Sequence, residues 1–134
     1  MVARDFSLKK SSEQEDPLTR RIIACAIEVH KRLGPGLLEK LYKEAMIIEM
    51  ELNNLRGEKS VKVPVHYKDK SIGDYFIDLL VEDTVVLELK SVERHDPVFD
   101  AQILSYMKLT SKKVGLLINF NSKMVKDGIK RFVL

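Results

Sequence analysis

The chain has 134 residues, of which 45% are hydrophobic and 32% charged, and its formal net charge is +3. This length and composition exclude a disordered chain and predict one ordinary globular domain. The single cysteine, Cys25, excludes an intrachain disulfide, and its apolar helical surroundings indicate a buried, unreactive thiol. No apolar run approaches the ~20 residues of a membrane span, and the first residues lack the apolar core of a secretory signal. We therefore expect a cytoplasmic protein with no membrane partner.

The first half of the chain predicts a leader, two helices and a strand. Residues 1–16 are polar and predict a flexible leader, which leaves residues 17–134 as a single domain. Asp16 followed by Pro17 is typical of an N-cap and first helical residue, and Gly34 begins the run that ends this helix. A second helix is predicted from residue 37 or 38 to about residue 55. Residues 59–68 alternate as a first strand, in which Pro64 indicates a sheet edge or a bulge.

Residues 75–81 and 84–92 predict an antiparallel hairpin. A loop of three residues, 82–84, would pair Val81 with Val85 and place Asp78 opposite Glu88. A two-residue loop would send Asp78 to the other face. The three-residue loop also aligns one continuous apolar face, which favours it; that face comprises Ile77, Leu79, Val81, Val85, Leu87 and Leu89.

The remaining elements complete an α/β pattern. Asp96 and Pro97 predict the N-cap and start of a third helix that reaches about residue 109. Residues 114–120 form a nearly continuous apolar run, which indicates a strand covered on both faces, and residues 128–134 predict a short edge strand. This order predicts a mixed sheet covered by the first two helices on one side and by the third helix on the other.

Three charges in the hairpin point to chemistry. Opposed carboxylates at Asp78 and Glu88 would repel each other, and Lys90 would share a strand face with Glu88. A hard divalent cation such as Mg²⁺ binds through one or two carboxylates, so a metal site explains this pattern. The alternative is an ion pair from Lys90 to either acid on a solvated face.

These residues resemble a known family. Asp78 with Glu88-Leu89-Lys90 is similar to the core of the PD-(D/E)xK nuclease superfamily, and residues 36–42 resemble the signature of the GxxExxY family within it. The resemblance extends over most of the chain, from about residue 22 to residue 134, and includes residues 28–31, 101–102 and 114–120. It implies a restriction-endonuclease-like core, in which a mixed central β-sheet is flanked by helices on both faces.

The resemblance also implies roles for individual residues. Asp78 and Glu88, with the Leu89 carbonyl, would hold Mg²⁺ or Mn²⁺, and Lys90 would position the nucleophile. Glu39 would complete the metal site or hold a metal-bound water, and Gln102 would orient water or phosphate. Supporting roles fall to His30, Tyr42 and Tyr106. Sequence alone leaves simpler interpretations open: Glu39 as a glutamate at a helix N-terminus, Gln102 as an exposed glutamine and His30 as a structural histidine.

The implied function is metal-dependent hydrolysis of nucleic acid, with DNA as the expected partner. A non-catalytic module that binds nucleic acid or protein is the alternative, because Phe76 stands where family members often carry an arginine. A homodimer is left open. From residue 108 onward, seven basic residues stand against one acid, and we expect them either to line the approach to the site or to form an ordinary solvated surface.

Overall fold

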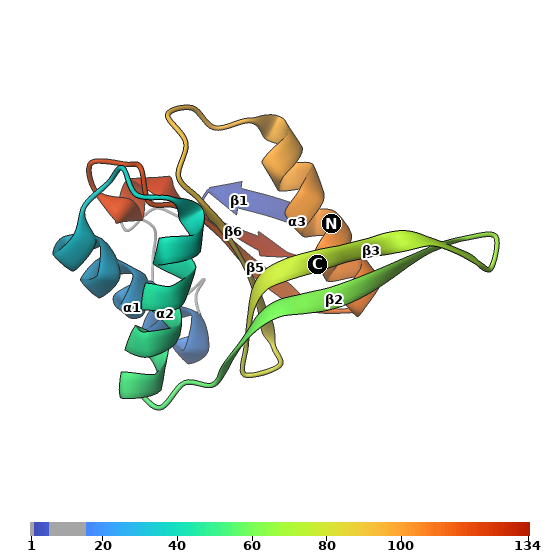
Figure 1. The fold of residues 1–134 in the computed structure, drawn as a ribbon, viewed down its shortest axis with the longest axis horizontal. Coiled ribbons are helices and arrows are strands. Elements are labelled where there is room, and N and C mark those ends of the chain that lie inside the picture. The colour runs from blue at the N-terminus through green and yellow to red at the C-terminus, as the bar shows by residue number, and fades with distance from the viewer. Residues whose placement is uncertain (1, 6–15) are drawn as a thin grey trace.

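A mixed six-stranded sheet forms the centre of the molecule (Figure 1), in the order β1-β6-β5-β4-β3-β2. The β4–β5 pair is parallel, and the other neighbouring strands pair antiparallel. The structure is a computed structural model that describes residues 2–5 and 16–134. Its elements are β1 (Val2–Asp5), α1 (Pro17–Leu33), α2 (Glu39–Leu52), β2 (Gly57–Tyr67), β3 (Lys70–Val81), β4 (Val85–Lys90), α3 (Pro97–Thr110), β5 (Val114–Asn119), the 3-10 helix η2 (Val125–Gly128) and β6 (Ile129–Val133).

The helices cover both faces of the sheet, as predicted. One apolar core joins α1 and α2 to alternate residues of β3, β4 and β5, with Tyr42 and Met46 fully buried in it. The second core joins α3 to the opposite face through Ile103 and Met107. Residues of β5 enter both cores, which explains its continuous apolar sequence.

Side chains cap two of the helices where the sequence predicted. Asp16 accepts a hydrogen bond from the Thr19 N–H at 2.7 Å at the start of α1. Asp96 accepts one from the Val98 N–H at 3.0 Å at the start of α3. Such caps satisfy N–H groups that have no partner within the helix, and so they fix where each helix begins.

The hairpin has the predicted register near its turn but not farther along. Val81 pairs with Val85 across a loop of three residues, and the β3–β4 ladder ends at Leu79 and Leu87. The prediction of one continuous apolar face is wrong for Ile77, which packs in the core under α3, whereas Leu79 packs under α1 and α2. Across from Asp78, Ser60 has a φ of 52°, outside the β region, so the β2–β3 pair is irregular here.

Beyond this point β3 leaves β4 and continues with β2 as a long two-stranded arm (Figure 1). The arm begins at the point where Asp78 interrupts the apolar run of β3. Strand β2 is an edge of the sheet, and its register shifts between Val65 and His66, so Pro64 lies both at an edge and next to a bulge. The fork between β3 and β4 opens the sheet between two neighbouring strands.

The two chain ends pair with each other, which corrects two expectations. Residues 2–5 form the strand β1, so the prediction that they belong to a flexible leader is wrong. The rest of that predicted leader, residues 1 and 6–15, lies outside the described residues. The C-terminal strand β6 lies between β1 and β5 and is not an edge. Without β1, the outer side of β6 would expose unpaired main-chain groups, and backbone pairing of this kind needs no apolar pattern in the added strand.

We expect Cys25 to resist alkylation in the folded protein. Its side chain is 2% exposed, and burial, with a smaller contribution from Glu49, raises the pKa of the thiol to about 11. The thiolate that reacts is therefore scarce at neutral pH. Mass spectrometry after treatment with iodoacetamide should show an unmodified chain in buffer and complete modification in urea. Rapid labelling in buffer would contradict the burial.

Candidate functional site

Two carboxylates bridge the fork between β3 and β4. The Asp78 N–H donates to Glu88 Oε2 at 2.9 Å, and the Leu89 N–H donates to Asp78 Oδ2 at 2.8 Å. Each acid thus accepts a hydrogen bond from the main chain of the opposite strand, beyond the last ladder pair. The two side chains replace main-chain hydrogen bonds that the parting strands have lost. Asp78 and Glu88 are therefore held beside each other, as the predicted register requires.

Ionisation of both acids together is unfavourable. Glu88 is 5% exposed, and its burial, together with the nearby charge of Asp78, raises its pKa to about 8. The Asp78 N–H and Lys90 act in the opposite direction but do not cancel this effect. At neutral pH the pair therefore holds a proton or needs a cation, because two like charges in a buried site disfavour ionisation.

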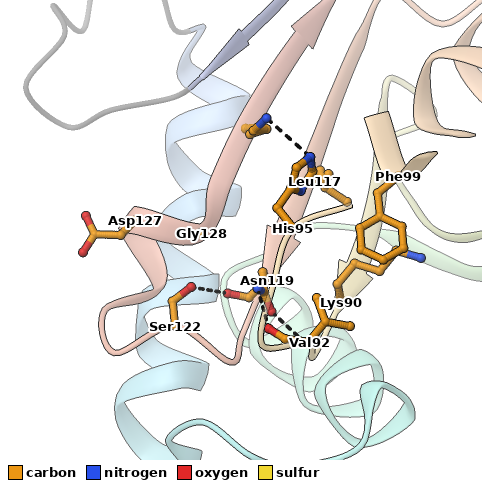
Figure 2. Close-up of a pocket in the computed structure, with 10 residues that line it drawn as sticks. Lys90, Val92, His95, Phe99, Leu117, Asn119, Ser122, Asp127 and Gly128 are labelled. Carbon is orange, nitrogen blue, oxygen red and sulfur yellow. Dashed lines mark hydrogen bonds between the residues drawn. The ribbon is translucent and has the colours of Figure 1, made fainter. Parts of the chain in front are cut away.

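Lys90 lies at the end of β4 without an ion pair. Its Nζ sits 4.4 Å from the centre of the Phe99 ring on α3, and no carboxylate among the described residues lies within salt-bridge distance of it. The predicted alternative of an ion pair to Asp78 or Glu88 is therefore wrong. Lys90 also lines a cavity of about 120 Å³ (Figure 2), in which Asn119 holds the main chain of Val92 through two hydrogen bonds.

On α3, Tyr106 lies close to the acids. Burial and the charges of Glu88 and Asp78, together with Tyr75, raise the pKa of its phenol to about 12. The Tyr75 ring packs edge-on against it, with ring centres 5.3 Å apart. Tyr106 is therefore a neutral hydrogen-bond donor beside the carboxylates. Gln102 lies one turn earlier on the same helix, half-buried, with no hydrogen bond to another described side chain or main-chain group.

Glu39 reaches the site from the first turn of α2. Its carboxylate accepts a hydrogen bond from the Ser91 N–H at 3.3 Å, directly after β4. With Asp78 it lines a cavity of about 190 Å³, and Lys40 and Lys43 complete the lining. Sequence reasoning missed both lysines. The signal for Lys43 was its spacing of four residues from Glu39, which places the two side chains on one helix face, and Lys40 lies three residues before Lys43.

Two of the expected supporting residues belong to the scaffold instead. The fully buried Tyr42 donates from its hydroxyl to the Gly34 carbonyl at 2.5 Å, accepts from the Leu37 N–H at 3.2 Å, and stacks on Phe120 with ring centres 4.4 Å apart. Tyr42 thus fixes the loop between α1 and α2. The Nε2 of the buried His30 lies 2.8 Å from the Ser122 carbonyl oxygen, which ties α1 to the loop after β5.

The loop before α2 is also tied to β4. The Ser91 hydroxyl donates to the Leu37 carbonyl at 2.6 Å, and Gly36 adopts a φ of 100°, a conformation that other residues rarely take. The stretch from Gly36 to Tyr42 therefore serves one structural purpose, which is to fix the start of α2 beside the end of β4. Glu39 is held next to Asp78 as a result.

Comparison with known protein families identifies the family of this chain. A model of the PD-(D/E)XK nuclease superfamily matches residues 16–132, which include both acids and Lys90. The chain belongs to the PD-(D/E)XK nuclease superfamily. Enzymes of this superfamily generally use divalent metal ions, and they act on nucleic acid. A search of curated proteins found no match.

The range matched by the superfamily model contains Asp78 and the run Glu88-Leu89-Lys90 at the fork. Within residues 2–5 and 16–134, no group of three or more acids, histidines or cysteines is placed to hold a metal ion. Leu89, expected as a ligand through its carbonyl, contacts Asp78 through its N–H. None of the helices in the described residues is long and apolar enough to cross a membrane.

The C-terminal basic residues do not form one surface around the site, which corrects one of the two interpretations left open. Lys112 pairs with Asp83 at the hairpin turn, and Arg131 pairs with Asp16 at the start of α1. Lys123 and Lys126 line a separate groove beside α1. Lys130 lines the same cavity as Lys90. The residues separate because β5, η2 and β6 lead the chain past different faces of the domain.

We expect the Tyr42→Phe substitution to lower the free energy of unfolding by about 1–2 kcal/mol, because it leaves the half-buried Gly34 carbonyl without its donor. Urea unfolding followed by circular dichroism measures this change. Tyr67→Phe is the matched control, since Tyr67 is an exposed tyrosine on β2. An equal effect of both substitutions would contradict the structural role assigned to the Tyr42 hydroxyl.

We expect the Glu88→Gln variant to be more stable than the natural chain at alkaline pH. The pKa of Glu88 is about 8 in the folded protein against an ordinary value of 4.5, so the folded state binds the proton more tightly. The free energy of unfolding of the natural chain therefore falls as pH rises between these values. Glutamine stays neutral and still accepts the hydrogen bond from Asp78. The gain in the free energy of unfolding from Glu88→Gln should be absent below pH 4.5. Above about pH 8 it should reach at most about 5 kcal/mol, at about 1.4 kcal/mol per pKa unit.

Urea titrations at a series of pH values, in the presence of a chelator, measure this difference directly. Glu58→Gln, at an exposed glutamate of β2, serves as the control and should leave the pH profile unchanged. The same pH profile for Glu88→Gln and the natural chain would show that Glu88 is an ordinary ionised acid.

Proposed function

We propose that this protein is a nuclease of the GxxExxY type that hydrolyses phosphodiester bonds of DNA in the cytoplasm with the help of Mg²⁺ or Mn²⁺. The observation that carries the proposal is the acid pair Asp78 and Glu88, held at the fork by hydrogen bonds from the opposite strands, with Lys90 on the same strand as Glu88. A site of this kind concentrates negative charge that only a proton or a cation offsets.

The residues at the fork fit a hard divalent cation in their chemistry. Each acid uses one oxygen to accept a main-chain hydrogen bond, which leaves its second oxygen for a metal. Mg²⁺ binds through one or two carboxylates and keeps several of its waters, so two acids are enough. The raised pKa of Glu88 supports the same conclusion, because a bound cation favours the ionised carboxylate. When bound, the ion would supply Lewis acidity and a more acidic water at neutral pH.

The chain's own residues supply the remaining functions. Lys90 carries a positive charge that has no carboxylate partner among the described residues, so it is available to contact a phosphate oxygen and stabilise charge that develops there. Glu39, held by Ser91, would orient a water in the cavity that it shares with Asp78. Lys40 and Lys43 line that cavity and provide contacts for the phosphate backbone. Tyr106 lies near Glu88 and Asp78 from α3 and would donate a hydrogen bond to the substrate, and Gln102, one turn earlier on the same helix, would do the same.

A non-catalytic binding module is the second candidate. It is favoured by the acid count, because among residues 2–5 and 16–134 no third acid joins the pair within metal-binding geometry. Phe76 is 55% exposed on β3, where family members often carry a cation, and this removes one phosphate contact. Such a module would keep the fork as a structural junction and bind nucleic acid without cleaving it.

Metal binding and cleavage separate the two candidates. We expect Mn²⁺ to raise the melting temperature of the natural chain and to support cleavage of DNA in a panel of single- and double-stranded DNA and RNA. Asp78→Asn and Glu88→Gln should abolish the response to Mn²⁺ in both assays. Lys90→Ala should preserve metal binding but lower cleavage by at least about a hundredfold, which is typical for the loss of one charge-stabilising group.

Asp74→Asn is the matched control, because Asp74 lies on the same strand and pairs with Lys62 at 3.6 Å on the β2–β3 arm. It should leave both measurements unchanged. Cleavage that survives both Asp78→Asn and Lys90→Ala would overturn the proposed mechanism. Binding of DNA without any response to Mn²⁺ would establish the binding module instead.

A further inference from the structure

Phe76 is a large aromatic side chain that is open to solvent beside the candidate site. It is 55% exposed and stands on β3, two residues before Asp78. Ile77, between them, packs in the core under α3, so Phe76 points to the opposite face of the sheet, because neighbouring strand residues alternate. Asp78 lines a cavity with residues of α2, which covers that same face. Phe76 and Asp78 therefore border one surface.

The Phe76 ring has no aromatic or cationic partner among residues 2–5 and 16–134. It also belongs to neither apolar core. The neighbouring Tyr75, by contrast, packs edge-on against Tyr106, with ring centres 5.3 Å apart. A ring as exposed as that of Phe76 contributes little to the packing of the domain, so its replacement tests binding without unfolding the chain.

Two lysines are placed along the stretch of β2 that pairs with this part of β3. Lys62 is the ladder partner of the ring and pairs with Asp74 at 3.6 Å. Solvent-exposed ion pairs are weak, so Lys62 is available to a phosphate. Lys43 donates to the Ser60 hydroxyl at 3.2 Å, two residues before Lys62, and also lines the cavity beside Asp78. An open ring among lysines is typical of surfaces for single-stranded nucleic acid, where phosphates contact cations and bases stack on aromatic rings.

The spacing between Phe76 and Asp78 suits one nucleotide. Two residues of a strand span about 6–7 Å, a distance that one nucleotide of an extended single strand can bridge. A phosphate held at Asp78 therefore brings the neighbouring base to the ring. In a duplex that base is paired and stacked on its neighbours, so the ring reaches its face only after the base is unstacked at a cost in free energy.

We infer that Phe76 stacks on an unpaired base next to the phosphate held at the acid pair, which makes single-stranded DNA the substrate. The inference rests on the proposed function for the position of the phosphate, whereas the stacking itself is measured by binding. Phe76 selects the substrate and takes no part in the chemical step. Every base has a face on which a ring can stack, so this contact gives no preference for sequence.

Fluorescence anisotropy with labelled oligothymidine in the presence of Mn²⁺ tests the stacking. Phosphorothioate linkages in every probe prevent cleavage during the titration. A second probe of the same length carries abasic sites, so it keeps the backbone without bases, and a third is a duplex. Phe76→Ala should weaken the binding of oligothymidine about 5- to 100-fold, the usual range for one base on one aromatic ring. It should leave the affinities for the abasic and duplex probes unchanged.

Further variants separate stacking from general apolar contact. Phe76→Trp should retain the affinity for oligothymidine because it keeps a ring, whereas Phe76→Leu should lose it. Full affinity in Phe76→Leu, or equal weakening of the oligothymidine and abasic probes by Phe76→Ala, would overturn the inference. Tyr67→Ala is the matched control, since Tyr67 is 62% exposed at the far end of the arm, and it should change none of the affinities. Circular dichroism verifies that each variant is folded.

Cleavage of DNA with natural linkages distinguishes this inference from the proposed function. Phe76→Ala should slow Mn²⁺-dependent cleavage of single strands by about the factor that it costs in binding. Cleavage of single strands at an unchanged rate would refute the inference and leave the nuclease in place. A chain that cleaves nothing, yet loses its preference for oligothymidine in Phe76→Ala, would refute the nuclease and keep the stacking surface.

Discussion

The fold and the candidate site depend on the same exchange of hydrogen bonds at the fork between β3 and β4. Two parting strands leave main-chain N–H groups without ladder partners, and such groups are costly when buried. Glu88 and Asp78 accept hydrogen bonds from the N–H groups of Asp78 and Leu89, so these two donors stay bonded where the sheet divides. Two acids in one buried place are in turn tolerated because each is hydrogen-bonded. The same two hydrogen bonds thus support the division of the sheet and hold the two acids beside each other.

A chain of short contacts connects this fork to α2, which lies far away in the sequence. Tyr42 fixes the loop that ends at Leu37, and the Ser91 hydroxyl ties that loop to the end of β4. Glu39 follows directly and binds the Ser91 N–H. Rigid positioning of this kind matters for a reactive site, because small displacements of catalytic groups are costly in rate. The sequence motif from Gly36 to Tyr42 therefore contributes one residue to the site and several to its support.

The sequence predicted most of the architecture because the deciding signals are local. Caps at Asp16 and Asp96, the three-residue turn before Val85 and the apolar β5 each follow from a few neighbouring residues. The end of the ladder at Leu79 did not follow, since alternation alone treats a strand as regular. The position of Lys90 over Phe99 depends on how α3 packs on the sheet, and the pairing of β1 with β6 joins the two ends of the chain. No local sequence pattern predicts either of these two contacts.

Helix α2 connects the site to the molecular surface. Its first residue, Glu39, is bound at the end of β4, so the orientation of the helix fixes where that carboxylate lies relative to Asp78. Its buried residues attach it to the sheet on one side, while Leu41, Ile48 and Leu52 are exposed on the other side. Short helices draw most of their stability from packing and not from their own hydrogen bonds. Packing on the buried side of α2 therefore stabilises the element that carries Glu39, because both belong to the same fourteen residues.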